Sequence, residues 1–436
     1  MSPITVGVLS LLLMVLLICS GLQVAVALLL LSLVGVWMIK GNFETATSLL
    51  AQASIDSIAS YDFGVVPLFV LMGLLVAVAG IGKDIFEVAD RIFGRVKGGL
   101  GIATVFANAG FAATTGISIA SAAVFTRVAV PEMLRFGYGA RFSVGVVAGS
   151  SVLGMLIPPS LLMILYAFLA EQSVGTMFIS GVLPGILLSV VYGIGIWAMA
   201  HFWPSYVGGS AKIEKAPMGA LEFLLKLVPI TSLIFLVLGG LYAGWFTATE
   251  GGAVGALGAL MIAWLRRQLD RKGLWKVLTE TGQITVSVLF LIISANLYSR
   301  MLTLSGLPQY IVGAMAQAQF GVVEFMAVYI VIILLLGCII DSGSIMLIVL
   351  PLLLPVARSL GLDLVWFGVV TIIAVEIGLL TPPFGLSVYV VKSTLNDPRV
   401  GLADIFAGVL PFTIMMFAVL MIVIFVPWFA TGLIGK

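Results

Sequence analysis

Doubled prolines and small hydroxyl residues recur in two apolar stretches of this 436-residue chain. The first stretch carries Ser118 and Pro158-Pro159, and the second carries Ser342 and Pro382-Pro383, each 224 residues later. Other anchors at the same offset are Pro131 and Pro355, Gly137 and Gly361, and Gly154 and Gly378. Duplicated, interrupted hydrophobic segments are typical of the substrate and ion site of a secondary transporter.

These stretches can supply oxygen atoms, from backbone carbonyls and side-chain hydroxyls, that bind a cation. Two successive prolines lack amide donors and clash with the preceding turn, so a helix must break and leave carbonyl oxygens free near 154–157 and 378–381. Polar hairpin segments at 107–123 and 337–345 add the hydroxyls of Thr114, Thr115, Ser118, Ser121, Ser342 and Ser344. Hard cations bind oxygen, and helix N-termini attract anions. We therefore expect one Na⁺ site in each repeat, with an anionic substrate between the two sites.

Two carboxylates accompany the second repeat. Glu376 precedes Pro382 by six residues, where an intramembrane acid indicates a functional role. The alternative is that it pairs with an interfacial arginine or lies near the outer surface. Asp341, at the second hairpin tip, is a candidate for ion or gating chemistry, or else a helix cap. The doubled prolines themselves have a plainer interpretation as kinks, with the small residues serving close helix packing, but two copies in register argue against it.

Composition places these motifs in a membrane. Apolar residues make up 61% of the chain and charged residues 9%, whereas soluble domains carry roughly 25% charged residues. This excludes a nucleic-acid-binding protein. The absence of P-loop, H-E-x-x-H and G-x-S-x-G motifs argues against an enzyme. Spans are predicted near 4–19, 22–39, 62–80, 142–171, 176–200, 227–243, 251–265, 280–300, 364–392 and 405–430.

The distribution of basic residues predicts that the repeats are inverted. If regions 99–131 and 322–355 are re-entrant hairpins, 17 of the 21 Lys and Arg residues fall on one side of the membrane, as the positive-inside rule requires. Segment 83–97 is then an amphipathic arm on the basic side, whereas its counterpart 307–321 has no charge. Segment 203–226 is expected along the surface. Three crossings between the copies turn the second upside down, which is the architecture of alternating-access carriers.

These residues resemble the large membrane subunit of tripartite ATP-independent periplasmic (TRAP) transporters, the family of C4-dicarboxylate and sialic acid permeases. The resemblance covers essentially the whole chain. It rests on TTGISIASAA, GSSVLGMLIPPS, FTATEGGAVGA, and LPLLLPVARSLGLDLVWFGVV followed by EIGLLTPPFG. It implies an all-α polytopic elevator-type fold of the ion-transporter superfamily and Na⁺-driven import of an organic acid across the bacterial inner membrane. No organic cofactor is implied. The expected partners are a periplasmic substrate-binding protein and a small four-helix membrane subunit on a separate chain.

The resemblance also implies a division of the chain and two ligand sets. The expected parts are N-terminal scaffold helices (1–61), repeat 1 (62–171), connecting scaffold helices (172–279), repeat 2 (280–392) and a C-terminal helix (393–436). The implied Na⁺ ligands are Thr115, Ser118, Gly154, Ile157 and Pro159 in repeat 1, and Gly337, Ser342, Gly378, Thr381 and Pro383 in repeat 2. The implied substrate region holds Thr114, Ser121, Asp341, Ser344 and Glu376.

The first hairpin departs from the family pattern S-G-S-S-x-A-D. Ile117 replaces a hydroxyl residue and Ser121 replaces the acid, so no role of that acid transfers to this chain. Two other functions stay open at this point. One is a standalone Na⁺- or H⁺-coupled carboxylate carrier of the same superfamily, without a binding protein. The other is a membrane assembly or receptor subunit that carries no flux.

Overall fold

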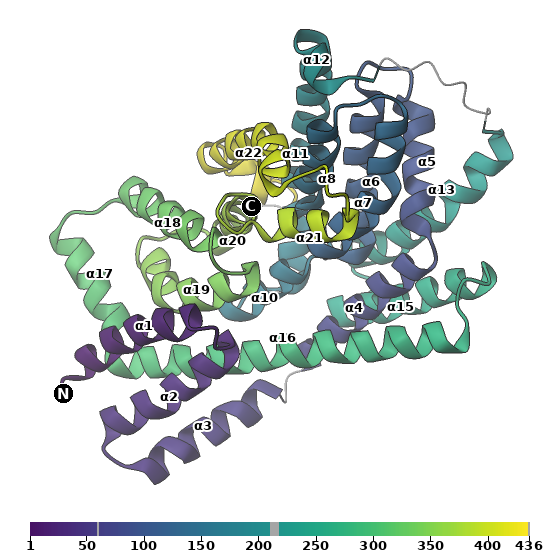
Figure 1. Cartoon of the computed structure of the whole chain (residues 1–436). Helices are drawn as coiled ribbons and strands as arrows, with labels where there is room; N and C mark the ends of the chain where they lie inside the picture. The colour runs from purple at the N-terminus through teal and green to yellow at the C-terminus, as the bar shows by residue number, and fades with distance from the viewer. Residues whose placement is uncertain (59–60, 210–217, 435–436) are drawn as a thin grey trace.

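A computed structural model describes residues 1–58, 61–209 and 218–434, and in this part of the chain helices are the only regular secondary structure apart from one isolated bridge between Tyr138 and Gly208. Among these described residues, six helical stretches are long and apolar enough to cross a membrane, and two bent helix pairs bring the number to eight if each pair is one span. The six are 174–202, 220–242, 248–265, 271–305, 342–359 and 402–425. The expectation of an all-α polytopic protein is confirmed (Figure 1).

The longest helix, α16, organises one side of the molecule (Figure 1). Its 35 residues (Arg271–Ser305) reach about 52 Å at 1.5 Å per residue, well beyond a bilayer core of roughly 30 Å. The helices packed against it include α1 (Pro3–Cys19), α2 (Val24–Lys40), α3 (Phe43–Ile58) and α4 (Val65–Val78). Helix α15 (Ala248–Leu265) covers α4 and starts with a capping box between Thr247 and Glu250.

Helix α3 was missing from the sequence prediction. Its outer face carries exposed Glu44, Gln52 and Asp56, which break the apolar run that would mark a span. Together with η1 (Tyr61–Gly64) and α4 it matches α16 at the 224-residue offset. The first repeat therefore begins with an interrupted helix where the second has a continuous one.

An arm helix follows each of these long elements. Helix α5 (Ile81–Phe93) bends by 66° from α4, and Gly80 makes the turn at φ 72°. Helix α17 (Leu307–Gln317) follows α16 through Gly306 at φ 71°. Glycine suits both turns because its lack of Cβ permits positive φ. The amphipathic arm predicted at 83–97 is thus found, with Ile85, Phe86, Val88 and Ala89 on its buried face.

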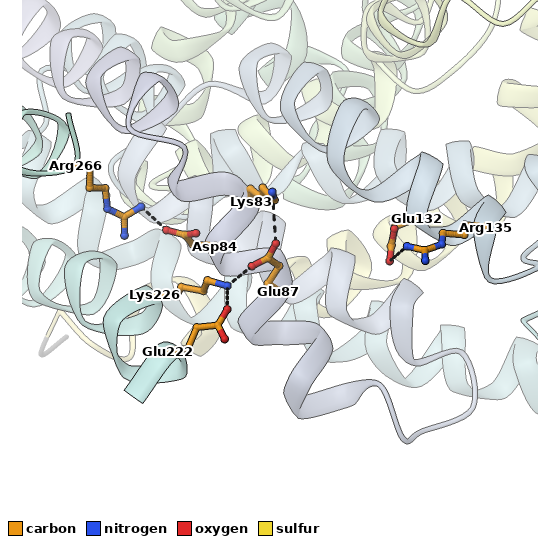
Figure 2. Close-up of polar contacts among 8 residues, drawn as sticks. All are labelled: Lys83, Asp84, Glu87, Glu132, Arg135, Glu222, Lys226 and Arg266. Carbon is orange, nitrogen blue, oxygen red and sulfur yellow. Dashed lines mark hydrogen bonds and ion pairs between the residues drawn. The ribbon is translucent and has the colours of Figure 1, made fainter. Parts of the chain in front are cut away.

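Ion pairs fix the first arm to its neighbours (Figure 2). Arg266, at the end of α15, pairs with Asp84, and both side chains are mostly buried. Lys226 of α13 (Ala220–Ile234) lies 2.5 Å from Glu87 and 2.5 Å from Glu222. Partly buried pairs in a cluster hold geometry better than isolated surface pairs. The arm is therefore held by charge on the side where the sequence gathers its basic residues.

The hairpins and broken helices form as the sequence predicts. Hairpin 1 is α6 (Gly99–Thr115) and α7 (Ser118–Arg135), and hairpin 2 is α18 (Val322–Gly337) and α19 (Ser342–Ser359). The first broken helix is α8 (Ala140–Ser151), α9 (Leu153–Leu156) and α10 (Leu161–Ala170), and the second is α20 (Leu364–Gly378) and α21 (Leu386–Leu395). Each is interrupted at its proline pair, whose internal peptide bond is cis in both repeats.

The two repeats exchange the far halves of their broken helices. After its break, α10 packs against α19 of hairpin 2, while α21 packs against α7 of hairpin 1. Both hairpins and both broken helices are thereby joined into one helical body. Helix α22 (Leu402–Phe425) packs tightly on α8. The two backbones approach so closely that a Cβ on Gly145 would lie 2.1 Å from the Gly408 carbonyl oxygen.

Two regions connect the repeats. Helix α11 (Val174–Phe202), which the sequence grouped with the connecting scaffold helices, packs against α6, α9, α10, α20 and α22. Segment 203–226 was expected along the surface, but it contains the short helix α12 (Pro204–Val207) and then, from Ala220, the first turns of a membrane-length helix. Residues 210–217 of that expected surface segment lie outside the described part of the chain. The remaining short helix, α23 (Trp428–Thr431), follows α22.

Candidate functional site

In repeat 1 the hairpin tip lies directly against the proline break. The Gly116 carbonyl oxygen accepts a hydrogen bond of 3.2 Å from the Leu161 amide, just past the prolines. A Cβ on Gly154 would lie 3.0 Å from the backbone of Ser118. From the other side, Gly73 of α4 approaches Thr115 so closely that a Cβ there would lie 2.8 Å from the Thr115 carbonyl oxygen. A Cβ at Gly73 would overlap the backbone, and one at Gly154 would be tightly crowded, so glycine suits both contacts.

The structure thus brings together Thr115, Ser118, Gly154 and Pro159, four of the five residues expected at the first Na⁺ site. Ile157, the fifth, leaves the helix in an extended conformation immediately before the prolines. A small pocket at this place is lined by residues that include Thr115, Gly116, Ile117, Pro159 and Ser160. Pro158 has no amide hydrogen for the Gly154 carbonyl. The break therefore leaves the Gly154 carbonyl without its helical amide donor, beside a small pocket whose lining also includes the apolar residues Phe69, Val70, Leu161 and Ile164.

The hydroxyls near this tip are mostly directed at backbone. Those of Thr114 and Thr115 donate to the Phe111 carbonyl, at 2.8 and 3.0 Å. The Ser160 hydroxyl donates to the Met155 carbonyl and accepts from the Met163 amide as the N-cap of α10. A donating hydroxyl keeps its oxygen lone pairs. These side chains can therefore still face a cation as acceptors.

In repeat 2 the contact between tip and break is made by glycines. A Cβ on Gly337 would lie 2.6 Å from the Cα of Gly378, and the reverse distance is the same. The Phe384 amide, just past Pro383, donates to the Cys338 carbonyl at 3.2 Å. The Thr381 hydroxyl donates to the Ile377 carbonyl at 2.8 Å. Ser342 begins α19 beside this tip.

The two sites differ in exposure. Pro158 and Pro159 are buried, whereas Pro382 and Pro383 are exposed. Likewise Ser118 is 1% exposed, whereas Ile339 at the second tip is 53% exposed. The first site is enclosed by α4 and the hairpin, and the second opens to the surface of the chain.

Asp341 forms the cap that the sequence left as an alternative. Its carboxylate accepts from the Ser344 amide at 3.1 Å and from the Ser344 hydroxyl at 2.5 Å, at the start of α19. Asp341 and Ser344 are two of the five residues expected in the substrate region, and they lie together at the second hairpin tip, where Asp341 is exposed. The cap is compatible with a further ligand because a carboxylate has more acceptor positions than these bonds use.

Glu376 is fully buried, and neither of its carboxyl oxygens has a hydrogen-bond partner among the described residues. Its electrostatic neighbour is Tyr192 of α11, whose hydroxyl also has no hydrogen-bond partner in the described chain. The sequence offered pairing with an arginine or a place near the outer surface as the alternative to a functional role, and the structure shows neither among the described residues. Tyr192 belongs to a connecting helix that the repeat pattern does not include.

Ser121, expected in the substrate region, belongs to a buried hydrogen-bond network. Its hydroxyl donates to the Asn108 side-chain oxygen at 2.5 Å, and the Asn108 amide donates to the Ser150 hydroxyl at 2.6 Å. All three side chains are fully buried. Sequence reasoning overlooked Asn108, although an asparagine inside an otherwise apolar helix was a usable signal.

The fold and its paired hairpin-and-break sites define the chain as a multi-pass membrane transporter protein. Residues 11–429 match the family model of the "Tripartite ATP-independent periplasmic transporter, DctM component". The chain belongs to this family, as the permease component and not as an enzyme.

Curated relatives agree with this assignment. The chain is 32% identical to the C4-dicarboxylate TRAP transporter large permease protein of Pseudomonas aeruginosa, over 87% of each chain. It is 30% identical to the Vibrio cholerae sialic acid TRAP transporter large permease protein, over 88% of this chain and 89% of that one.

Two solved structures share the fold. The crystal structure of the Alcanivorax borkumensis YdaH transporter matches with a TM-score of 0.62 at 13% identity, over 89% of this chain and 90% of that one. The Neisseria gonorrhoeae MtrF structure matches with a TM-score of 0.60 at 12% identity, over 98% and 96%. At these identities the likeness concerns the fold alone.

Proposed function

We propose that the protein is the large permease subunit of a Na⁺-coupled, binding-protein-dependent importer of an organic acid in the bacterial inner membrane. The observation that carries the proposal is the pairing of each hairpin tip with a proline break, twice, within one helical body. Each pairing gathers carbonyl and hydroxyl oxygens, which are the ligands a hard cation prefers. Helix N-termini at Ser118 and Ser342 add partial positive charge for an anion.

The names of several relatives support a substrate class. Those named above carry the names of C4-dicarboxylate and sialic acid transporters, and an Escherichia coli relative, 28% identical, is named for 2,3-diketo-L-gulonate. All three substrates are carboxylates. We propose a carboxylate of this kind, presented by a periplasmic binding protein, as the cargo of this chain.

A small membrane subunit completes the proposed assembly. The chain spans only 59% of an isethionate relative from Oleidesulfovibrio alaskensis whose name joins two components, DctMQ. The additional length of that relative supports a second membrane component, which we propose to be a separate four-helix chain here.

We further propose an elevator movement. The body that contains both hairpins and both broken helices would slide against α3, α4, α15 and α16, while arms α5 and α17 connect the two parts. The sites would then travel together across the bilayer, since α10 and α21 tie each repeat to the other.

The test is uptake into liposomes containing the permease and its small subunit, with the binding protein and a radiolabelled acid outside. The acids are a C4-dicarboxylate, sialic acid and 2,3-diketo-L-gulonate. We expect accumulation of one of them under an inward Na⁺ gradient and none under K⁺. Equal accumulation without Na⁺ would contradict the coupling.

Omission of partners separates the other functions. A standalone carrier would accumulate substrate without the binding protein and the small subunit. A receptor or assembly subunit would give no flux in any combination.

A further inference from the structure

A buried hydrogen-bond chain connects three helices beneath the first hairpin tip. It runs from the Ser121 hydroxyl on α7 to the Asn108 side chain on α6, from there to the Ser150 hydroxyl on α8, and ends on the Val146 carbonyl at 2.6 Å. Each of the two hydroxyls in this network donates to a buried acceptor: that of Ser121 to the Asn108 oxygen, and that of Ser150 to the Val146 carbonyl. Fully satisfied networks of this kind stiffen a protein interior.

Its position relates it to the proposed first Na⁺ site. Asn108 precedes Thr115 on α6 by seven residues, and Ser121 follows Ser118 on α7 by three. Ser150 precedes Gly154 by four residues. This hydrogen-bond chain therefore joins the three segments that carry expected Na⁺ ligands, and each of its side chains lies within two helical turns of one of those ligands.

The second repeat provides an internal comparison. The positions equivalent to Asn108, Ser121 and Ser150 at the 224-residue offset are Ile332, Ile345 and Ala374. Ile345 and Ala374 are fully buried and Ile332 is partly buried. The same hairpin and broken helix therefore form with apolar residues at all three positions. Burying an amide is unfavourable unless it is hydrogen-bonded, so folding alone does not explain the polar chain in repeat 1.

We propose that Asn108 is a positioning residue for the first Na⁺ site, which it serves by holding α6, α7 and α8 at fixed separations. The inference rests on the proposed Na⁺ coupling. Asn108 touches no ion itself; it sets the distance between the tip backbone at Thr115 and Ser118 and the carbonyls at the break. Residues that orient metal ligands from behind typically change metal affinity about 10–100-fold when they are replaced.

The experiment compares three variants of the purified permease with its small subunit. Asn108→Leu removes the network. A triple variant, N108I/S121I/S150A, copies the residues of repeat 2 into repeat 1. The matched control is Thr126→Val on α7, whose buried hydroxyl bonds only within its own helix, to the Ala122 carbonyl. Two quantities are measured for each: the unfolding temperature without Na⁺, and the Na⁺ concentration that gives half of the Na⁺-induced rise in that temperature.

For Asn108→Leu we expect the half-saturating Na⁺ concentration to rise about tenfold or more, with transport at saturating Na⁺ retained. The triple variant should regain the wild-type unfolding temperature without Na⁺ but keep the raised Na⁺ requirement. Thr126→Val should match the wild type in Na⁺ requirement. Should Asn108→Leu fail to fold, the triple variant decides alone.

A triple variant with wild-type Na⁺ affinity would overturn the inference, because the network would then be interchangeable with apolar packing. An unchanged Na⁺ requirement in Asn108→Leu would overturn it as well. A wild-type protein that shows no response to Na⁺ gives a different result: the proposed Na⁺ coupling fails, and this inference fails with it.

Discussion

At the residue scale, the candidate sites are built from backbone oxygens that glycine and proline make accessible. Proline withholds the amide that would otherwise bind a carbonyl, and glycine permits the hairpin tip to reach it. In repeat 1 the Gly154 backbone lies against Ser118, and in repeat 2 Gly337 lies against Gly378. Ser121 stands where the family usually has an acid, and its hydroxyl bonds to Asn108. The lack of that acid fits a site built from backbone oxygens.

Bulky residues at the tip or the break should abolish transport. Ser118→Leu places a branched side chain at a position that is 1% exposed, and Thr381→Leu removes a hydroxyl beside the second proline pair. We expect uptake in the liposome assay to fall to background in both, while expression and docking of the binding protein persist. Wild-type flux in both variants would mean that the breaks are structural kinks only.

Gly337→Ala should be equally damaging because of backbone contact. The added Cβ would lie 2.6 Å from the Cα of Gly378, so α18 and α20 must separate. We expect lower thermal stability together with loss of Na⁺-dependent uptake. Gly313→Ala on arm α17 is the control, since nothing lies within 4 Å of its Cβ position. Wild-type stability and uptake in both alanine variants would show that the close approach of Gly337 to Gly378 is not needed.

At the scale of elements, the two arms differ although they occupy equivalent positions. Arm α5 is fixed by ion pairs through Asp84 and Glu87 (Figure 2), whereas segment 307–321 carries no charge. The difference follows from inversion, because the arms lie on opposite membrane sides and basic residues gather on one side. Arm 1 is therefore fixed by charge, and arm 2 by apolar packing against α19.

Removing the arm charges should slow transport without changing Na⁺ affinity. Asp84→Asn leaves Arg266 mostly buried without its carboxylate, and an uncompensated buried charge costs about 3 kcal/mol or less at such a partly exposed site. We expect Asp84→Asn with Glu87→Gln to lower the uptake rate and the unfolding temperature. The half-saturating Na⁺ concentration should stay at the wild-type value.

Glu132→Gln is the matched control for the arm. Its carboxylate pairs with Arg135 within the same helix at 3.7 Å (Figure 2), and an exposed pair of this kind contributes about 0.3–0.5 kcal/mol. An equal loss of uptake rate in this variant would point to a general charge effect and away from the arm.

At the scale of the whole molecule, the proposed elevator movement would divide the helices into two assemblies, the hairpin-containing body and the helices around α4 and α16, and aromatic pairs lie where the two meet. Phe63 of η1 stacks on Phe168 of α10 with ring centroids 4.7 Å apart, and Phe69 of α4 meets Phe178 of α11 at 5.5 Å. Under the proposed elevator movement these contacts break and reform in each transport cycle. Contacts inside the hairpin-containing body, such as Arg141 with Asp404 at 2.7 Å, persist throughout.

Cross-linking distinguishes these two kinds of contact. In a background without native cysteines, Phe63→Cys with Phe168→Cys joined by a short thiol cross-linker should stop uptake, and cleavage of the linker should restore it. Arg141→Cys with Asp404→Cys, cross-linked in the same way, should leave uptake intact. Normal transport by the first cross-linked pair would mean that the two assemblies do not slide past each other.

Local features were predictable because their causes are local. Proline pairs break a helix wherever they stand, so both broken helices and the hairpins before them could be located. Helix α3 was missed because its polar face interrupts the apolar pattern by which spans are located. Connectivity alone does not show which neighbours a connecting helix such as α11 packs against. The capping of α19 by Asp341 was within reach, since a cap depends on residues three positions apart.

The sequence by itself determined the duplication, the inverted orientation and the oxygen-rich breaks, because prolines, glycines and the placement of basic residues act along the chain. Only the tertiary structure decided which polar groups meet. Asn108 joins Ser121 and Ser150 from three different helices, and Glu376 lies within electrostatic range of Tyr192 of a connecting helix. Such pairings depend on the rotation and separation of packed helices, which many distant contacts fix together and no local pattern records.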